Sequence, residues 1–219
     1  MKKVLILLVM LMFFPFVKAA YYVNSESCST GAGGTNWNDA ICSLDDFPYL
    51  IRGETYYIAD GTYGGYVFDD EELGEDYIII KKATPLEHGT DVGWVDSYGD
   101  GQALWNGYVM FVRGYYIFNG STGGGPSSWK SGYGFKFPSF EGVKIYLANP
   151  TLVPEDMVNI SNIIISHVEM EGVYPGVPGR SRGIDATASN SFKSNITISH
   201  CYIHDESLPF YFILSLIHI

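Results

Sequence analysis

Basic residues are scarce in this chain of 219 residues, in which 13 Lys and Arg stand against 24 Asp and Glu. The formal net charge of -11 at pH 7 repels phosphate backbones and anionic membranes, so nucleic acid is not an expected partner. Amphipathic helical patterns are scarce as well, since none is longer than the stretch from Asn38 to Phe47. A doubly wound α/β fold, which needs a helix between successive strands, is therefore disfavoured.

Glycine and aromatic residues are abundant instead. The chain has 25 Gly and 17 Tyr, and aromatic residues make up 16% of it. Aromatic and β-branched side chains suit the pleated surface of a sheet, and glycine supplies tight turns. The composition therefore predicts an all-β chain, and its length fits one domain.

The first nineteen residues predict a cleavable signal peptide. Lys2 and Lys3 precede an apolar run from Val4 to Phe16, and residues 17–19 form a small-x-small cleavage pattern. We expect the mature protein to begin at Ala20 and to be secreted or periplasmic. The apolar run is shorter than the ~20 residues that span a bilayer, so we expect no stable membrane span, with an uncleaved anchor as the alternative.

Cysteine is rare, with three in the chain. Cys28 and Cys42 bracket a Gly-rich segment near the expected mature N-terminus. Because export permits disulfides, we expect these two to be bonded. Cys201 then has no partner for a disulfide within the chain. It is a reactive thiol, a link to another molecule or a small buried hydrophobic residue.

One internal repeat stands out when the chain is compared with itself. The segment Asn162–Met170 recurs about 33 positions later as Asn195–Ile203, and five of the first six positions are identical. In a solenoid each strand pairs with the equivalent strand of the next coil. The expected vertical pairs are Ile163 with Ile196, Ile165 with Ile198, and Val168 with Cys201. This register makes Cys201 an interior residue.

Polar residues that flank the repeated strands are expected at turns. Asn162 and Asn195 suit such positions, because Asn tolerates left-handed backbone conformations. His167 and His200 also recur, and a repeated position indicates a stacked structural residue more than a catalytic one.

Earlier segments resemble cruder members of the same series. Residues 54–63, 76–82 and 114–120 are β-rich and close on Gly, Asp or Asn. The Gly-rich stretches 85–105 and 123–138 are interpreted as loops that leave the solenoid wall. We therefore predict a parallel β-helix over residues 20–206, with a β-sandwich or jelly roll as the alternative.

The two ends of this domain are expected to differ. The stretch from Asn38 to Phe47 is interpreted as an N-terminal cap, since a solenoid must cover the apolar core at its start. Residues 207–219 form an aberrant apolar tail without strand period, which we interpret as a truncated or mistranslated end. A hydrophobic C-terminal plug is the alternative.

Two motifs carry a resemblance to a known group of proteins. The run Trp37-Asn38-Asp39-Ala40, followed by residues 52–63 with the sequence RGETYYIADGTY, resembles the opening coil of the secreted right-handed parallel β-helix proteins of the pectate-lyase-like superfamily. The repeats at 162 and 195 resemble that superfamily's coil, so the similarity extends from about Trp37 to Asp205. The superfamily includes polysaccharide lyases, glycoside hydrolases, epimerases and adhesins, so the resemblance implies a fold more than an activity.

The resemblance implies carbohydrate chemistry, with a lyase favoured over a hydrolase. Lyases that cut uronic-acid polymers need a cation, often Ca²⁺, to neutralise the substrate carboxylate, and a Lys or Arg near the acidic carbon. Glu169, Glu171 and Asp185 are the candidate metal ligands, and Arg180 and Arg182 are the candidate catalytic residues. Solvated surface charge is the alternative for all five.

Three tryptophans lie in or beside the long loops and could stack on sugar rings. They are Trp94, Trp105 and Trp129, and packing over the solenoid wall is the alternative. We therefore expect an exported protein that acts on or binds polysaccharide, most simply a lyase for an acidic polysaccharide. A non-catalytic surface adhesin that binds glycan or protein is the second hypothesis.

Overall fold

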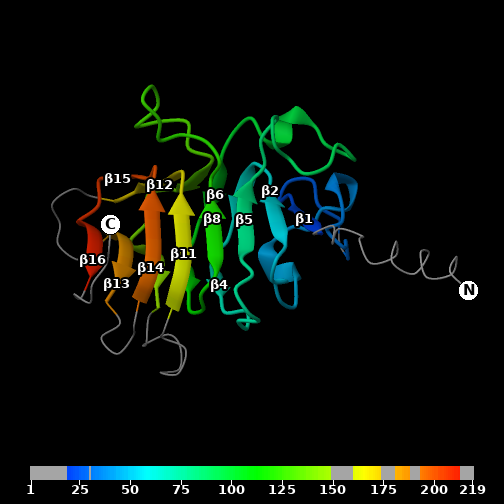
Figure 1. Ribbon diagram of the computed structural model, residues 1–219. Helices are drawn as coiled ribbons and strands as arrows, with labels where there is room; N and C mark the ends of the chain where they lie inside the picture. Colours follow the sequence, from blue (N-terminus) through cyan, green and yellow to red (C-terminus); the bar gives the residue numbers. More distant parts are fainter. Residues whose placement is uncertain (1–18, 30, 149–159, 174–180, 188–192, 213–219) are drawn as a thin grey trace, which may run out of the picture.

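The computed structural model describes residues 19–29, 31–148, 160–173, 181–187 and 193–212 (Figure 1). Regular structure within these ranges consists of β-strands and short 3-10 helices, which confirms the all-β prediction. The predicted signal peptide lies outside the described residues except for its last one, and the first strand begins at Ala20. Among the described residues, no helix is long and apolar enough to cross a bilayer.

The strands form three sheets, here called A, B and C, and each coil after β1 contributes one strand to each sheet. Sheet A contains β1 (Ala20–Val23), β2 (Thr55–Ile58), β5 (Ile78–Lys82), β8 (Tyr116–Asn119), β11 (Ile160–Ser166) and β14 (Lys193–Ser199). Sheet B contains β3 (Gly61–Tyr63), β6 (Ala103–Trp105), β9 (Phe135–Phe137), β12 (Val168–Glu171) and β15 (Tyr202–His204). Sheet C contains β4 (Tyr66–Phe68), β7 (Val109–Phe111), β10 (Gly142–Leu147), β13 (Ser181–Ala186) and β16 (Leu208–Phe212).

All pairings between these strands are parallel, and the chain passes through sheets A, B and C in turn. The structure is therefore a parallel β-solenoid whose strands stack along one axis (Figure 1). Strand β16 takes up the first part of the segment that we interpreted as an aberrant tail, because residues 208–212 pair with β13. Residues 213–219 lie outside the described part of the chain.

The predicted register between the two repeated strands is confirmed. Ile163 pairs with Ile196 and Ile165 with Ile198. Both strands begin two residues before the predicted Asn, and Cys201 packs partly buried against the core. Successive residues of a strand point to opposite sides of the sheet, so the isoleucines at alternate positions of these strands all face inward.

Stacked polar side chains lie near both ends of the strands β11 and β14 in sheet A. Asn162 and Asn195 have φ of 58° and 52°, and the Asn195 amide donates to the Asn162 side-chain oxygen. His167 and His200 have φ of 57° and 51°, and their rings stack with centroids 5.0 Å apart. These positions are left-handed bends that recur in the two coils that carry the repeat, as the sequence indicated.

Aromatic residues fill the interior in stacks that run from coil to coil. Phe68 lies on Phe111 with ring centroids 4.7 Å apart, and Phe118 contacts Phe135 at 4.6 Å. Each fully buried ring of this kind stabilises the fold by roughly 1.5–3 kcal/mol. The core is therefore continuous between neighbouring coils.

The N-terminal cap differs from the predicted helix. Residues 38–47 contain parts of two 3-10 helices, η2 (Trp37–Asp39) and η3 (Leu44–Asp46), with no α-helix. Between them Ile41 forms a parallel bridge with Val23, which interrupts any helical run. The predicted disulfide between Cys28 and Cys42 is confirmed, with a Cα–Cα distance of 5.0 Å. Ile41 and Leu44 pack into the core, so this segment does cover the start of the solenoid.

The two long loops leave the wall between sheets A and B and project on the same side of the molecule (Figure 1). Each is shorter than predicted, because the stretch 85–105 ends in β6 and the stretch 123–138 ends in β9. The first loop also holds the 3-10 helix η4 (Asp96–Tyr98). These short strands were missed because three residues are too few to show a period.

Candidate functional site on the outer face of sheet B

Strand alternation places a group of charged side chains on the outer face of sheet B. In β12, Val168 and Met170 are fully buried in the core, so Glu169 and Glu171 point outward. The pairing register places Glu169 beside Lys136 of β9 and beside Tyr202 of β15. Three successive coils therefore contribute to one surface.

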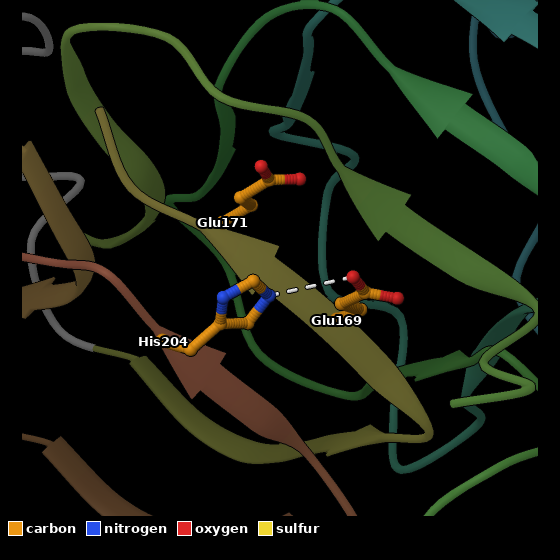
Figure 2. Close-up of side chains that lie close together, drawn as sticks. All are labelled: Glu169, Glu171 and His204. Carbon is orange, nitrogen blue, oxygen red and sulfur yellow. Dashed lines mark hydrogen bonds and ion pairs between the residues drawn. The ribbon is translucent and has the colours of Figure 1, made fainter. Parts of the chain in front are cut away.

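Lys136 and His204 connect the carboxylates of this surface. The Lys136 Nζ lies 2.7 Å from Glu169 Oε1 and 2.9 Å from Glu171 Oε2. His204 Nε2 lies 3.4 Å from Glu169 Oε1, and its Nδ1 lies 2.9 Å from Asp205 Oδ2. Figure 2 shows the imidazole facing Glu169 from the neighbouring strand. We call these residues, Lys136, Glu169, Glu171, His204 and Asp205, the sheet B cluster.

The carboxylates hold Lys136 in its charged form. Partial burial opposes that charge, but the hydrogen bonds to Glu169 and Glu171 outweigh it and raise the pKa of Lys136. The ammonium is thus the counter-ion of both glutamates.

Aromatic rings lie beside the sheet B cluster. Tyr202 stacks on His204 with ring centroids 4.3 Å apart, and Tyr133 is nearly parallel to Tyr202 at 6.2 Å. The Gln102 side-chain amide donates to the Tyr133 carbonyl at 2.7 Å and contacts Glu169 Oε2 at 3.5 Å. Gln102 and Tyr133 also line a cavity of about 510 Å³ between the two long loops. The charged surface and this cavity therefore adjoin.

A second concavity lies at the corner between sheets B and C. It has a volume of about 480 Å³ and is lined by Asp45, Phe47, Tyr66, Asp69 and Tyr108, among others. Burial, with Asp70, Asp69 and Asp45 nearby, raises the pKa of Tyr66, so this phenol stays protonated. Rings and carboxylates together suit a hydroxyl-rich ligand, but Lys136 and His204 are absent from this lining.

The structure separates the residues that the sequence grouped as a metal and catalytic site. Glu169 and Glu171 lie together, whereas Asp185 is on β13 in sheet C. There Arg182 donates to Asp185 at 2.6 Å, so these two partner one another. Arg182 is likewise on β13 in sheet C, whereas both glutamates are on β12 in sheet B. Arg180 lies outside the described residues.

The three candidate tryptophans have different environments. Trp105 is 2% exposed and packs between Phe118 and Phe135, so the expectation of a sugar platform at this ring is corrected. Trp94 is half-buried, with its ring stacked on His88 at 4.1 Å. Trp129 is 57% exposed, and its carbonyl accepts a hydrogen bond from the Tyr133 hydroxyl. Trp129 is thus the candidate whose ring is open to a ligand.

Sequence reasoning missed Lys136, Tyr202 and His204, although a signal for them existed. Lys136 and Glu169 are separated by the same 33 positions as the two repeated asparagines. Applying this spacing forward from Glu171 reaches His204. The repeat length therefore locates the neighbours of each outward residue once the coil register is known.

The sheet B cluster does not fit the expected Ca²⁺. One ligand atom from each of Glu169, Glu171 and His204 lies within 4.8 Å of the others. Ca²⁺ takes about six to eight oxygen ligands, whereas this set offers two carboxylates and an imidazole nitrogen. The Lys136 ammonium also lies between the two carboxylates, where a cation would bind. The described residues thus form an ion-paired network rather than a calcium cage.

Comparisons with known proteins found no relative, since no family model, no curated protein and no solved structure matches the chain. The chain is therefore classed by its own geometry, as an all-β parallel solenoid with a polar site on one wall.

Proposed function

We propose that this protein is an exported right-handed parallel β-helix of the pectate-lyase-like type that binds a polysaccharide across the outer face of sheet B. The observation that carries the proposal is the continuity of the sheet B cluster with Tyr202 over three neighbouring coils. A polysaccharide is extended and repetitive, and a solenoid wall offers a matching extended surface. The half-buried ring of Tyr202 supplies an apolar face, and the charged groups can bond to sugar hydroxyls.

The reaction that we propose is β-elimination on an acidic polysaccharide. In this reaction a base removes the proton on the carbon next to the uronate carboxylate. A carbon–carbon double bond forms, the bond to the glycosidic oxygen breaks, and that oxygen leaves with a proton. Lys136 supplies a positive charge for the uronate carboxylate, and the His204 imidazole supplies the nitrogen that acts as the base. No step requires Ca²⁺.

Product absorbance tests this reaction directly. The purified protein is incubated with pectin, alginate and glycosaminoglycans, with and without a chelator, and unsaturated uronate is followed by its ultraviolet absorbance. We expect product from one of these polymers and its loss in His204→Gln. His88→Gln is the matched control, because His88 belongs to the first long loop and pairs with Asp91. No product from any polymer would show that the lyase proposal is wrong.

A non-catalytic glycan-binding role is the second candidate, and the charge of the site favours it. The sheet B cluster holds three carboxylates against one ammonium, and both glutamates already pair with Lys136. An anionic polymer is repelled by such a surface, whereas a neutral glycan is not. Binding of a neutral polysaccharide without any new reducing end, measured by affinity electrophoresis, would support this role. Absence of binding to every polysaccharide, acidic or neutral, would overturn both candidates.

A further inference from the structure

A second group of polar side chains is buried inside the solenoid at the corner between sheets B and C. Lys144 belongs to β10, Ser181 is the first residue of β13, and Glu206 lies between β15 and β16. These residues come from three successive coils. They adjoin the sheet B cluster, since the charges of Glu171 and His204 act on Lys144 and Glu206, but they take no part in the proposed function.

The side chains of this group lie close together and are buried from solvent. The Lys144 and Glu206 side chains are 0% and 1% exposed, and Lys144 Nζ lies 3.6 Å from Glu206 Oε1. Lys144 Nζ donates to Ser181 Oγ at 3.0 Å and to the Phe140 carbonyl at 2.5 Å. The Ser181 hydroxyl in turn donates to Glu206 Oε2. The other carboxyl oxygen, Oε1, is buried without a hydrogen bond.

Two hydrogen-bond acceptors face the Lys144 nitrogen, and the centroid of the Phe140 ring lies 4.0 Å from it. An ammonium has three N–H donors, and two acceptors are in hydrogen-bonding contact with it here, with Glu206 Oε1 at a longer distance. A neutral amine donates to the same two acceptors and keeps its lone pair for the carboxyl group. Burial also lowers the pKa of Lys144, which is the usual way in which a lysine becomes a nucleophile.

We propose that Lys144 and Glu206 join in an isopeptide bond. Lys144 Nζ attacks the Glu206 carboxyl carbon, an N–C bond forms, and the C–Oε2 bond breaks. The ammonium and carboxylate together hold all the atoms of one amide and one water, so the step needs no oxidant, reductant or further reactant. The Ser181 hydroxyl touches both groups and passes a proton from the nitrogen to the departing oxygen.

The chain contains an internal control for this proposal in the buried pair of Lys82 and Asp60. Lys82 Nζ lies closer to its carboxylate, at 2.7 Å, but the Asp60 side chain is 16% exposed. Asp60 accepts the Gly101 N–H, and Lys82 Nζ donates to the Ala83 carbonyl, so in the described structure no hydroxyl links the two groups. If a short distance were sufficient, Lys82 and Asp60 would be cross-linked as well. The proposed proton relay through Ser181 predicts a bond between Lys144 and Glu206 instead.

Mass spectrometry of the full purified chain is the test. We expect an intact mass lower by one water molecule than the disulfide-bonded sequence requires. After reduction, trypsin should fail to cleave at Lys144, and one branched peptide should contain both Lys144 and Glu206. Lys82 and Asp60 should appear without such a branch. Recovery of ordinary peptides ending at Lys144 in full yield would overturn the proposal.

Three variants separate the roles within the group. Glu206→Gln should still form the branched peptide, with loss of ammonia in place of water. Lys144→Arg should abolish the branch, because a guanidinium is a poor nucleophile. Ser181→Ala should lower the linked fraction severalfold in a protein whose circular dichroism is unchanged. An unchanged linked fraction in Ser181→Ala would remove the relay from the mechanism, and its persistence in Lys144→Arg would overturn the assignment of the bond.

Discussion

Gly65 lies where two neighbouring coils approach each other closely, and replacing it with Ala should destabilise the solenoid. A Cβ at this position would lie 2.3 Å from the carbonyl oxygen of Tyr108, which is backbone of the next coil and cannot rotate away. Ordinary contact begins at 3.4 Å, so the coils must separate by about 1 Å. That movement strains the hydrogen bond from Tyr66 N–H to the Tyr108 carbonyl, now 3.1 Å long. Overpacking and a weakened hydrogen bond together give about 2–4 kcal/mol.

The adjacent Gly64 provides a matched control for this prediction. A Cβ on Gly64 meets nothing within 4 Å, and the residue has no positive φ. Gly64→Ala should therefore be neutral or stabilise the fold by about 0.4–1 kcal/mol, because it restricts the unfolded chain. Urea unfolding of both variants measures the difference, and Gly65→Ala should also melt roughly 4–16 °C below the wild type. Equal unfolding free energies for the two variants would refute the argument from coil contact.

Three further predictions concern other buried groups. The double replacement Cys28→Ser and Cys42→Ser opens a loop with a sequence separation of 14, which should cost about 3 kcal/mol in urea unfolding. Burial raises the pKa of Cys201 to about 11, so its thiol should react with a disulfide reagent many-fold more slowly in the native protein than in urea. Burial lowers the pKa of Lys82, so the unfolded chain binds more protons between that value and the ordinary lysine pKa, and stability should rise with pH there. Lys82→Met should reduce this slope, as urea midpoints between about pH 7 and pH 10 would show, and the lowered pKa values of Lys144 and Lys193 account for the remainder.

The fold was predictable where the sequence repeats and where glycine and aromatic residues alternate. The pairing of Ile163 with Ile196 follows from one matching segment, because equal strands must stack to bury equal faces. Earlier coils show no such match, since loops of different length separate their strands. Strands as short as β6 and β9 are held by their neighbours rather than by their own pattern, so only the stacked structure identifies them.

The segment from Asn38 to Phe47 covers the start of the solenoid as expected, but it is not helical along its length, because tertiary contacts overrode local propensity. The stretch from Asn38 to Phe47 has helical spacing, yet the bridge between Ile41 and Val23 adds a strand-like pairing to the first coil. The capping box formed by Ser43 and Asp46 then starts a new short turn. Neither contact is visible in a single sequence, because both depend on residues that meet only in the folded chain.

The glutamates of the candidate site were predictable from the sequence, but Lys136 and His204 were not, and these two residues decide its chemistry. Glu169 and Glu171 were identified by type and position, but the basic residues expected beside them were Arg180 and Arg182, which are nearer in sequence. In a solenoid the next coil lies closer in space than the next loop, so Lys136 and His204 are the actual neighbours. This substitution of partners changes the expected chemistry from a calcium-bridged carboxylate to an ammonium and an imidazole held by two glutamates. It follows that replacing Lys136 should disturb the site, because Glu169 and Glu171 would lose the ammonium that they share.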